Sequence, residues 1–354
     1  MFNRIIRIAV AVGALFILGG CVRKAELTPE SEENYIGFSA GQSPLLRDAS
    51  TKSTTESFSS NGDTFAVFGE RVTSADEHSQ VFNGTTVSHH YCYNEILDRV
   101  TEDYWDYESH RYWYWASTSD RYDFVAVSPA LQRTNKIQSV DNLKVSTPYD
   151  ILAGVHSEDI LAAAYRRNGN VANPISTVQL SFAHMGSAVS ISLANSSENK
   201  FVTINSIWFK NLVVKADATV SLDNYGRPYL SWENLQRSAS KVREQQLNTV
   251  VGCGGEESGG FQIMIPQELS INAGEEYQPT LVINYTPDGG AATEHSILLR
   301  EVMRADGVTP LDRWEMGHKY TYSISMRLDG GLLVTVTTTP WDVPVEAETP
   351  GILI

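Results

Sequence analysis

The chain has 354 residues, 42% of them hydrophobic, and its 42 acidic and 27 basic residues give a net charge of −15. An acidic surface argues against nucleic-acid binding and against adsorption to anionic lipid headgroups. Only the first twenty residues contain a long apolar run, so the remainder does not resemble an integral membrane protein. The length allows two domains of ordinary size.

Residues 1–20 have the pattern of a secretion signal. Arg4 and Arg7 form a basic start, and an apolar run extends from Ile8 to Leu18. Small residues then precede Cys21, as in the lipobox of bacterial lipoproteins. We therefore expect cleavage before Cys21, lipidation of that cysteine, and a polar tether over residues 21–34 that lifts the folded part off the membrane.

Two further cysteines, Cys92 and Cys253, lie far apart in the sequence. They are able to pair in an oxidising compartment, but two cysteines do not make a disulfide scaffold. Whether they pair is left open by the sequence.

Short segments with β-branched and aromatic residues, separated by Gly, Pro and Asn turns, predict strands along the rest of the chain. The clearest period-two pattern runs from Val178 to Leu193, with a break at Gly186. We expect further strands at 35–40, 64–69, 122–128, 201–214, 219–222, 261–265, 279–285, 320–326 and 332–338. Residues 157–165 and 232–247 are the two segments for which a helix is considered.

Many short strands and little helix predict an all-β sandwich fold. A change in composition near residues 170–178 predicts a boundary between an N-terminal β-sandwich domain, 35–175, and a C-terminal one, 176–354.

No catalytic motif stands out. The sequence contains no Gly-x-Ser-x-Gly elbow, no His-Glu-x-x-His helix and no P-loop. His89, His90 and Cys92 lie close together, but no second cluster completes a zinc site, so an exposed loop is the better interpretation. We expect no enzyme activity, no metal and no cofactor.

The most aromatic part of the chain runs from Tyr104 to Trp115. Exposed Trp and Tyr rings stack on sugars, so Trp105, Trp113 and Trp115 are candidates for a glycan platform. The alternative is that alternate rings fill the sandwich core while the others cover an edge.

Several segments, in their order and spacing, resemble the Bacteroidales fimbrillin family, the Mfa-like and FimA-like subunits of type V pili. The segments are IGFSA at 36–40, NGDTFAVFG at 61–69, YWYW at 112–115, YDFVAVSP at 122–129, VQLSFAH at 178–184, FQIMIPQ at 261–267 and WEMGHKYTYSI at 314–324. The resemblance implies two tandem transthyretin-like β-sandwich domains, export as a lipoprotein, and display on the outer-membrane surface in a fimbrium.

The resemblance also implies assembly by strand exchange. A protease removes the N-terminal strand, and the groove that it leaves accepts a strand from another subunit, because an open sandwich edge exposes unpaired backbone and apolar surface. Arg47 is the position that matches the family's cleavage site, with Lys52 as the alternative. Residues 331–339 and the acidic-then-apolar segment 344–354 are both candidates for the donated strand.

The expected partners are other pilus subunits, the outer membrane through the lipid anchor, and a ligand on a host or bacterial surface. The alternative function is a glycan-binding surface lipoprotein. The sequence leaves open whether a pilus subunit of this kind belongs to the stalk, the tip or the anchor.

Overall fold

The computed structural model describes residues 35–42, 64–73, 75, 78–94, 99–109, 112–117, 119–130, 136–139, 143–153, 159–169, 177–195, 200–252, 255–258, 260–326 and 332–341. These residues form strands joined by turns, and the helical elements among them are the short 3-10 turns Glu275–Tyr277 and Leu299–Glu301. The prediction of an all-β fold is confirmed. Within the described part, no helix has the length and apolar character needed to cross a membrane.

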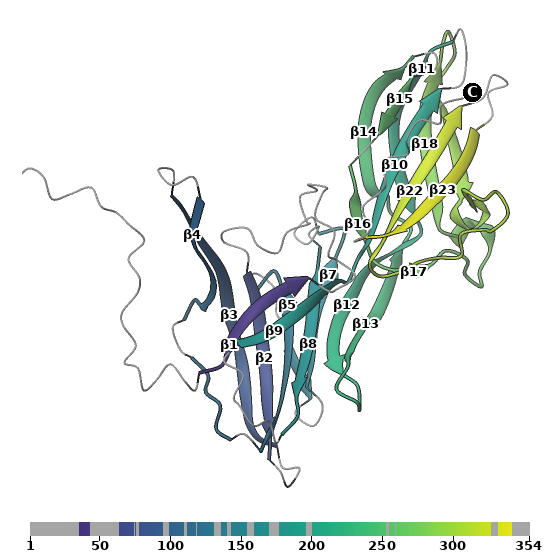
Figure 1. Ribbon diagram of the computed structural model, residues 1–354. Helices are drawn as coiled ribbons and strands as arrows, with labels where there is room; N and C mark the ends of the chain where they lie inside the picture. Colours follow the sequence, from purple (N-terminus) through teal and green to yellow (C-terminus); the bar gives the residue numbers. More distant parts are fainter. Residues whose placement is uncertain are drawn as a thin grey trace, which may run out of the picture.

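The first pair of sheets forms the lower part of the molecule in Figure 1. The seven-stranded sheet has the order β1-β9-β8-β5-β2-β3-β4, with strands β1 (Gly37–Gln42), β2 (Thr64–Val72), β3 (His78–Asn94), β4 (Arg99–Tyr107), β5 (Arg121–Ser128), β8 (Leu161–Arg167) and β9 (Thr177–His184). The four-stranded sheet has the order β13-β12-β7-β6, with strands β6 (Lys136–Ser139), β7 (Lys144–Asp150), β12 (Leu212–Leu222) and β13 (Pro228–Ser238).

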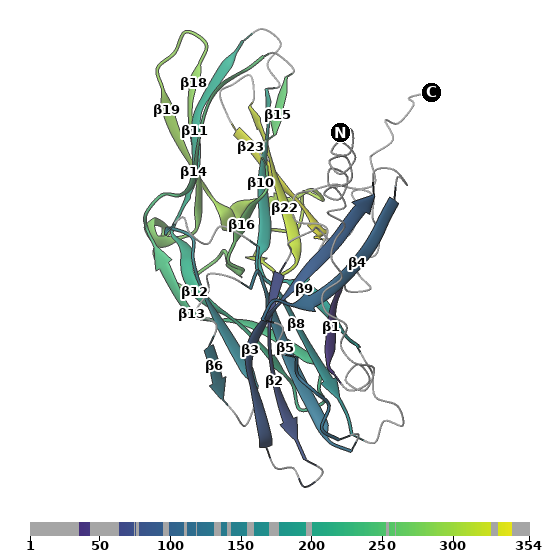
Figure 2. The same cartoon turned by 90° about the vertical axis from the view of Figure 1, so that its left-hand side faces the viewer.

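The second pair of sheets forms the upper part. Its larger sheet has the order β15-β10-β22-β23-β20, with β10 (Ser187–Asn195), β15 (Glu256–Ser258), β16 (Gln262–Met264, also paired with β10), β20 (Met303–Arg304), β22 (His318–Met326) and β23 (Leu332–Pro340). Its smaller sheet has the order β14-β11-β18-β19, with β11 (Val202–Lys210), β14 (Val242–Val251), β18 (Thr280–Pro287) and β19 (Thr293–Leu298). The strands β17 (Gln267–Glu268) and β21 (Arg313–Trp314) form a small separate sheet. Figure 2 shows the two layers of the upper part from the side.

The chain passes between the two pairs of sheets more than once. β9 belongs to the lower pair and β10 to the upper, and the long hairpin from β11 to β14 starts in the upper pair, enters the lower as β12 and β13, and returns. Asn211 adopts a left-handed conformation (φ 60°) at the point where β11 gives way to β12. Its side-chain amide donates to the carbonyls of Glu276 and Gln278, at 2.8 and 3.0 Å, which fixes this bend.

Strand pairing therefore crosses residue 175. β9, which begins just after it, pairs with β1 and β8, and β12 pairs with β7. A division of the chain at residue 175 remains a prediction, but the lower sheets contain both residues before it and residues 177–184 and 212–238.

Two apolar clusters result from this arrangement. The larger one lies between the sheets and continues through both pairs, from Phe68 in β2 to Tyr322 in β22. The smaller one lies on the other face of the seven-stranded sheet, and it contains Ile36 and Phe38 of the first segment together with Tyr107, Tyr122 and Phe124.

Neither of the two segments considered for a helix is helical in its described residues. Residues 161–167, which include the Ala-rich segment LAAAY, form β8, because pairing with β5 and β9 outweighs a local helix preference. Residues 232–238 belong to β13 and residues 242–247 to β14, and the alternation of half-buried and exposed side chains in β14 is that of a strand covered on one side.

Candidate functional site

The first described segment, Tyr35 to Gln42, lies at the edge of the seven-stranded sheet. β1 runs parallel to β9, with Gly37 opposite Thr177 and Gln42 opposite Phe182. On its other side, the Ile36 N–H donates to the Trp113 carbonyl at 2.7 Å, and Tyr35 forms a bridge to Tyr114. The strand thus lies between β9 and residues 112–117, and these two elements together are named the β1 seat.

The inward side chains of this strand are fully part of the core. Ile36 is 0% exposed and Phe38 is 3% exposed. The Phe38 ring lies 5.2 Å from that of Phe124 and 5.9 Å from those of Tyr107 and Trp113, with tilted and edge-on geometries. Edge-to-face contacts between such rings stabilise the packing beyond what the burial of apolar area contributes. Burying two side chains of this size stabilises the strand in its seat by roughly 3–6 kcal/mol.

A buried hydroxyl completes the seat. Tyr107, at the end of β4, donates its hydroxyl hydrogen to the Ile36 carbonyl at 2.6 Å. Burial raises the pKa of Tyr107 far above its ordinary value, so the hydroxyl keeps its proton and acts as a donor. Sequence reasoning did not single out Tyr107 among its aromatic neighbours, because its partner lies 71 residues away.

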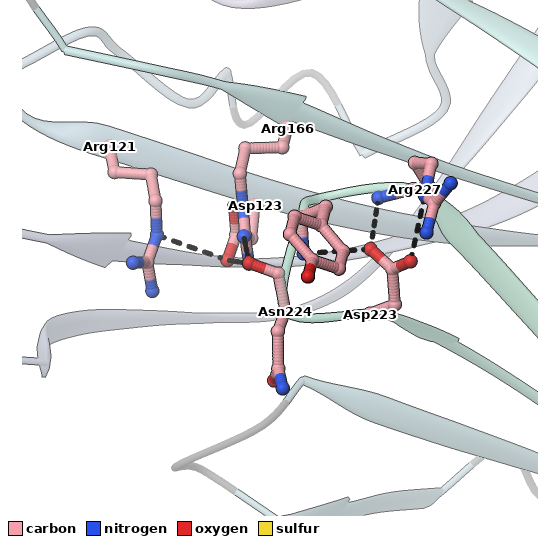
Figure 3. A network of polar contacts seen from close by, with 7 residues as sticks. Arg121, Asp123, Arg166, Asp223, Asn224 and Arg227 are labelled. Carbon is pink, nitrogen blue, oxygen red and sulfur yellow. Dashed lines mark hydrogen bonds and ion pairs between the residues drawn. The ribbon is translucent and has the colours of Figure 1, made fainter.

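A network of charged residues fastens the lower pair of sheets at the ends of β5, β8 and β12 (Figure 3). Asp123 is 1% exposed and accepts two hydrogen bonds from Arg166, at 2.7 and 2.8 Å, while Arg121 lies 3.3 Å away. The hydrogen bond to Asp123 raises the pKa of Arg166. Asp123 is thus paired with two arginines, and these ion pairs hold the ends of β5 and β8 together.

The same network holds the turn between β12 and β13. Asp223 accepts hydrogen bonds from the backbone N–H groups of Tyr225 and Arg227, and the Arg227 bond lowers the pKa of this carboxyl. The Arg166 guanidinium also donates to the Asn224 carbonyl at 3.4 Å (Figure 3). Gly226 has a φ of 78° and a Cβ there would lie 2.5 Å from the Arg166 side chain, so this position requires glycine.

A second buried polar group lies where the two pairs of sheets meet. His184, the last residue of β9, forms a short hydrogen bond with Asp159, and both side chains are buried. The Trp341 ring, just after β23, stacks on His184 with centroids 4.2 Å apart and planes at 8°. Within the described ranges, no group of three or more His, Cys, Asp or Glu residues is arranged to hold a metal ion. The contacts of His184 connect the end of β9 to the end of β23.

The predicted lipidation and cleavage residues, Cys21 and Arg47, and the alternative Lys52, lie outside the described residues. Cys253 does as well, so the structure does not test whether it pairs with Cys92. The sequence His89 to Cys92 lies on β3 opposite β4 rather than in a loop, which corrects that interpretation.

The three tryptophans of the glycan platform have different environments. Trp105 lies on β4 opposite His89, and its side chain is not among those described. Trp113 is half-buried and stacks on Phe82 at 4.8 Å, and Trp115 is 8% exposed within the smaller cluster. A ring as buried as that of Trp115 cannot stack on a sugar from solvent.

Comparisons with known proteins agree with this fold. A family model described as fimbrillin-like matches residues 51–341. A crystal structure of a fimbrial protein from Bacteroides vulgatus is similar, with a TM-score of 0.53 and 13% identity over 87% of this chain and 99% of that one. The tip fimbrial protein Mfa3 from Porphyromonas gingivalis, with a C-terminal truncation, gives a TM-score of 0.41 and 11% identity over 80% of this chain and 96% of that one. No curated protein matches the chain.

Proposed function

Because the chain belongs to the fimbrillin-like family, we propose that it is a non-enzymatic subunit of a cell-surface type V pilus that assembles by exchange of β1. In this proposal Cys21 carries the lipid that brings the subunit to the outer membrane, and cleavage after Arg47 separates β1 from the rest of the chain. The groove left in the β1 seat then accepts a strand of another subunit.

The observation that carries the proposal is the position of β1. It is a short edge strand that lies directly before a polar segment, and its two inward side chains, Ile36 and Phe38, are buried among aromatic rings. Its departure leaves an apolar groove with the unpaired backbone edge of β9 on one side and that of residues 112–117 on the other. Such an edge is a template for strand addition.

One candidate for the donated strand is occupied within its own chain. Residues 332–340 form β23, which pairs antiparallel with β22 from Met326 opposite Leu332 to His318 opposite Pro340. The proposal therefore assigns the donated strand to residues 342–354, which include the other candidate, 344–354, because β23 can then stay in its own sheet.

A reversible disulfide tests the exchange of β1. Ser39 and Gln179 are register partners on β1 and β9, so Ser39→Cys with Gln179→Cys, in a chain whose Cys92 and Cys253 are serine, should lock β1 in its seat. We expect the oxidised chain to be exported but absent from fimbriae, and the reduced chain to assemble.

A matched control places the crosslink where no exchange is proposed. Asn284→Cys with Glu294→Cys joins β18 to β19 in the upper sheets. This chain should assemble whether oxidised or reduced. If the chain locked at β1 and β9 assembled at the rate of this control, β1 would not be the exchanged strand.

A further inference from the structure

Arg167 is a fully buried cation that has no hydrogen-bond partner among the residues that the structure describes. It is the last residue of β8, its side chain is 2% exposed, and Nε, Nη1 and Nη2 all lack a hydrogen-bond partner in the described part of the chain. Its neighbours are different, because Arg71 pairs with Asp120 at 2.5 Å and Arg166 pairs with Asp123 at 2.7 Å. Burying a guanidinium without a carboxylate is costly, so this position calls for an explanation.

Two aromatic rings enclose the guanidinium. Its central carbon lies 4.4 Å from the centroid of the Trp115 ring and 5.8 Å from that of Tyr122. Those rings meet edge to face, with centroids 4.7 Å apart. Cation–π contacts offset part of the lost hydration, but they leave the five N–H donors unused.

The ring over Arg167 belongs to the β1 seat. Trp115 follows Trp113 and Tyr114, which form the backbone contacts with Ile36 and Tyr35, and the Phe38 ring lies edge-on to Trp113. On its other side the segment is held by Tyr122, whose hydroxyl accepts hydrogen bonds from the N–H groups of Ala116 and Ser117, at 2.7 and 3.2 Å. When β1 leaves, the segment that covers Arg167 loses its contacts with Tyr35, Ile36 and Phe38.

Arg167 also lies beside the groove itself. It is opposite Tyr122 on β5, and its side chain points to the same face as Ala163, which belongs to the smaller cluster with Ile36 and Phe38. β9 separates β8 from β1, and on it Val178 is opposite Phe38. Arg167 therefore lies two strands away from β1, on the face of the sheet that lines the groove.

We propose that Arg167 is the carboxylate-binding residue of this groove, and that its partner is an acidic side chain of segment 342–354 from a second copy of the chain. This inference rests on the proposed exchange of β1. The strand β1 itself, GFSAGQ, has no charged residue and leaves Arg167 unpaired. Segment 342–354 contains Asp342, Glu346 and Glu348 without any Lys, Arg or His, and in a strand Ile352 and Ile354 point to the same face as these carboxylates and match an apolar groove.

The charge on Arg167 then favours the polymer over the closed subunit. In the subunit with β1 in place, the contacts of the guanidinium within the described ranges are those with the Trp115 and Tyr122 rings, without a hydrogen bond. In the assembled form it also gains a buried, charge-assisted and bidentate hydrogen bond, which is the strongest kind that arginine makes.

A peptide-binding experiment on the full chain tests this inference. A thrombin recognition sequence in place of residues 48–53 allows β1 to be separated on demand. The chain is cut in the presence of a fluorescein-labelled peptide of residues 342–354, or of the same peptide with D342N, E346Q and E348Q, so that the peptide competes with segment 342–354 of other copies for the groove. Fluorescence anisotropy gives both Kd values, and the uncut chain measures binding with β1 in place.

We expect the acidic peptide to bind the cut chain at least tenfold more tightly than its neutral counterpart, and Arg167→Met to bring that ratio to about one. Arg167→Lys, which keeps the charge, should retain part of the preference. Arg227→Met removes an arginine that is exposed at the turn after β12 and should leave the ratio unchanged. Circular dichroism of each uncut variant checks its fold.

The outcomes separate the two proposals. Equal Kd values for the two peptides on the unmutated cut chain would overturn the role of Arg167 and leave strand exchange standing, and this result does not depend on any variant folding. A preference that survives Arg167→Met would overturn the assignment to this residue. Failure of both peptides to bind a cut chain that also stays a monomer would overturn the exchange proposal along with the inference.

Discussion

Phe38 gives the most direct measure of how firmly β1 is held. Truncating a fully buried phenylalanine costs about 3–5 kcal/mol, because the site loses both the transfer free energy and the packing around it. Phe38 meets this condition, since it is 3% exposed and in contact with three other rings. At an edge strand this loss lowers the free energy of local opening rather than that of the whole molecule.

Amide hydrogen exchange of the peptide covering 35–42 measures that opening. A loss of about 3–5 kcal/mol corresponds to exchange faster by roughly two to nearly four orders of magnitude in Phe38→Ala. Ser39→Ala is the matched control on the same strand, because the Ser39 Oγ is buried without a hydrogen-bond partner among the described residues and its removal should change exchange by less than about threefold. Unchanged exchange in Phe38→Ala, or equal acceleration in Ser39→Ala, would refute the account of the β1 seat.

Three further changes follow from the described contacts. Tyr107→Phe leaves the Ile36 carbonyl without its side-chain donor and should lower the free energy of local opening of β1 by about 1–3 kcal/mol, seen as faster amide hydrogen exchange. Amide hydrogen exchange at the native rate would mean that this hydrogen bond does not stabilise β1. Burial raises the pKa of Tyr320 to about 12, so the contribution of its protonated hydroxyl to stability is complete below about pH 10 and is lost as the pH rises toward 12. The urea midpoint of unfolding should therefore be lower at pH 11 than at pH 9, and the difference should be smaller in Tyr320→Phe. An equal pH dependence of the two chains would exclude Tyr320 as the cause. Asp159→Ala removes the hydrogen bond with His184 where the two pairs of sheets meet, and should lower the free energy of unfolding by about 1–3 kcal/mol. Thermal unfolding followed by tryptophan fluorescence measures this loss, and an unchanged Tm would show that the junction does not depend on this pair.

Local patterns predicted the strands well where one face is buried. The alternation from Val178 to Leu193 becomes β9 and β10, and the break between them is real. The sequence did not show why the pattern breaks at Gly186. The chain passes there from the lower sheets to the upper ones, and a Cβ at this position would lie 2.6 Å from the Ile263 side chain. A single sequence does not show which sheet a strand joins, so the return of β12 and β13 to the lower sheets could not be foreseen.

The candidate site was predictable only in part. The apolar alternation at 35–40 indicated a strand, and the structure places it at a sheet edge with Ile36 and Phe38 buried. The other wall of its seat, residues 112–117, lies more than seventy positions away, and such pairings leave no local signal. The aromatic residues 104–115 were interpreted as a possible glycan platform, because nothing in the sequence shows that the Trp115 ring covers Arg167.

The central claim is that β1 can be replaced, and the mass of the cut chain tests it most directly. The full chain with a thrombin site at 48–53 is cleaved without denaturant, and its products are followed by size-exclusion chromatography with light scattering and by denaturing mass spectrometry. The account predicts particles at whole-number multiples of the chain that lacks β1, with the β1 peptide released in a separate low-mass fraction. A cut chain that remained a monomer with the β1 peptide still bound would contradict it.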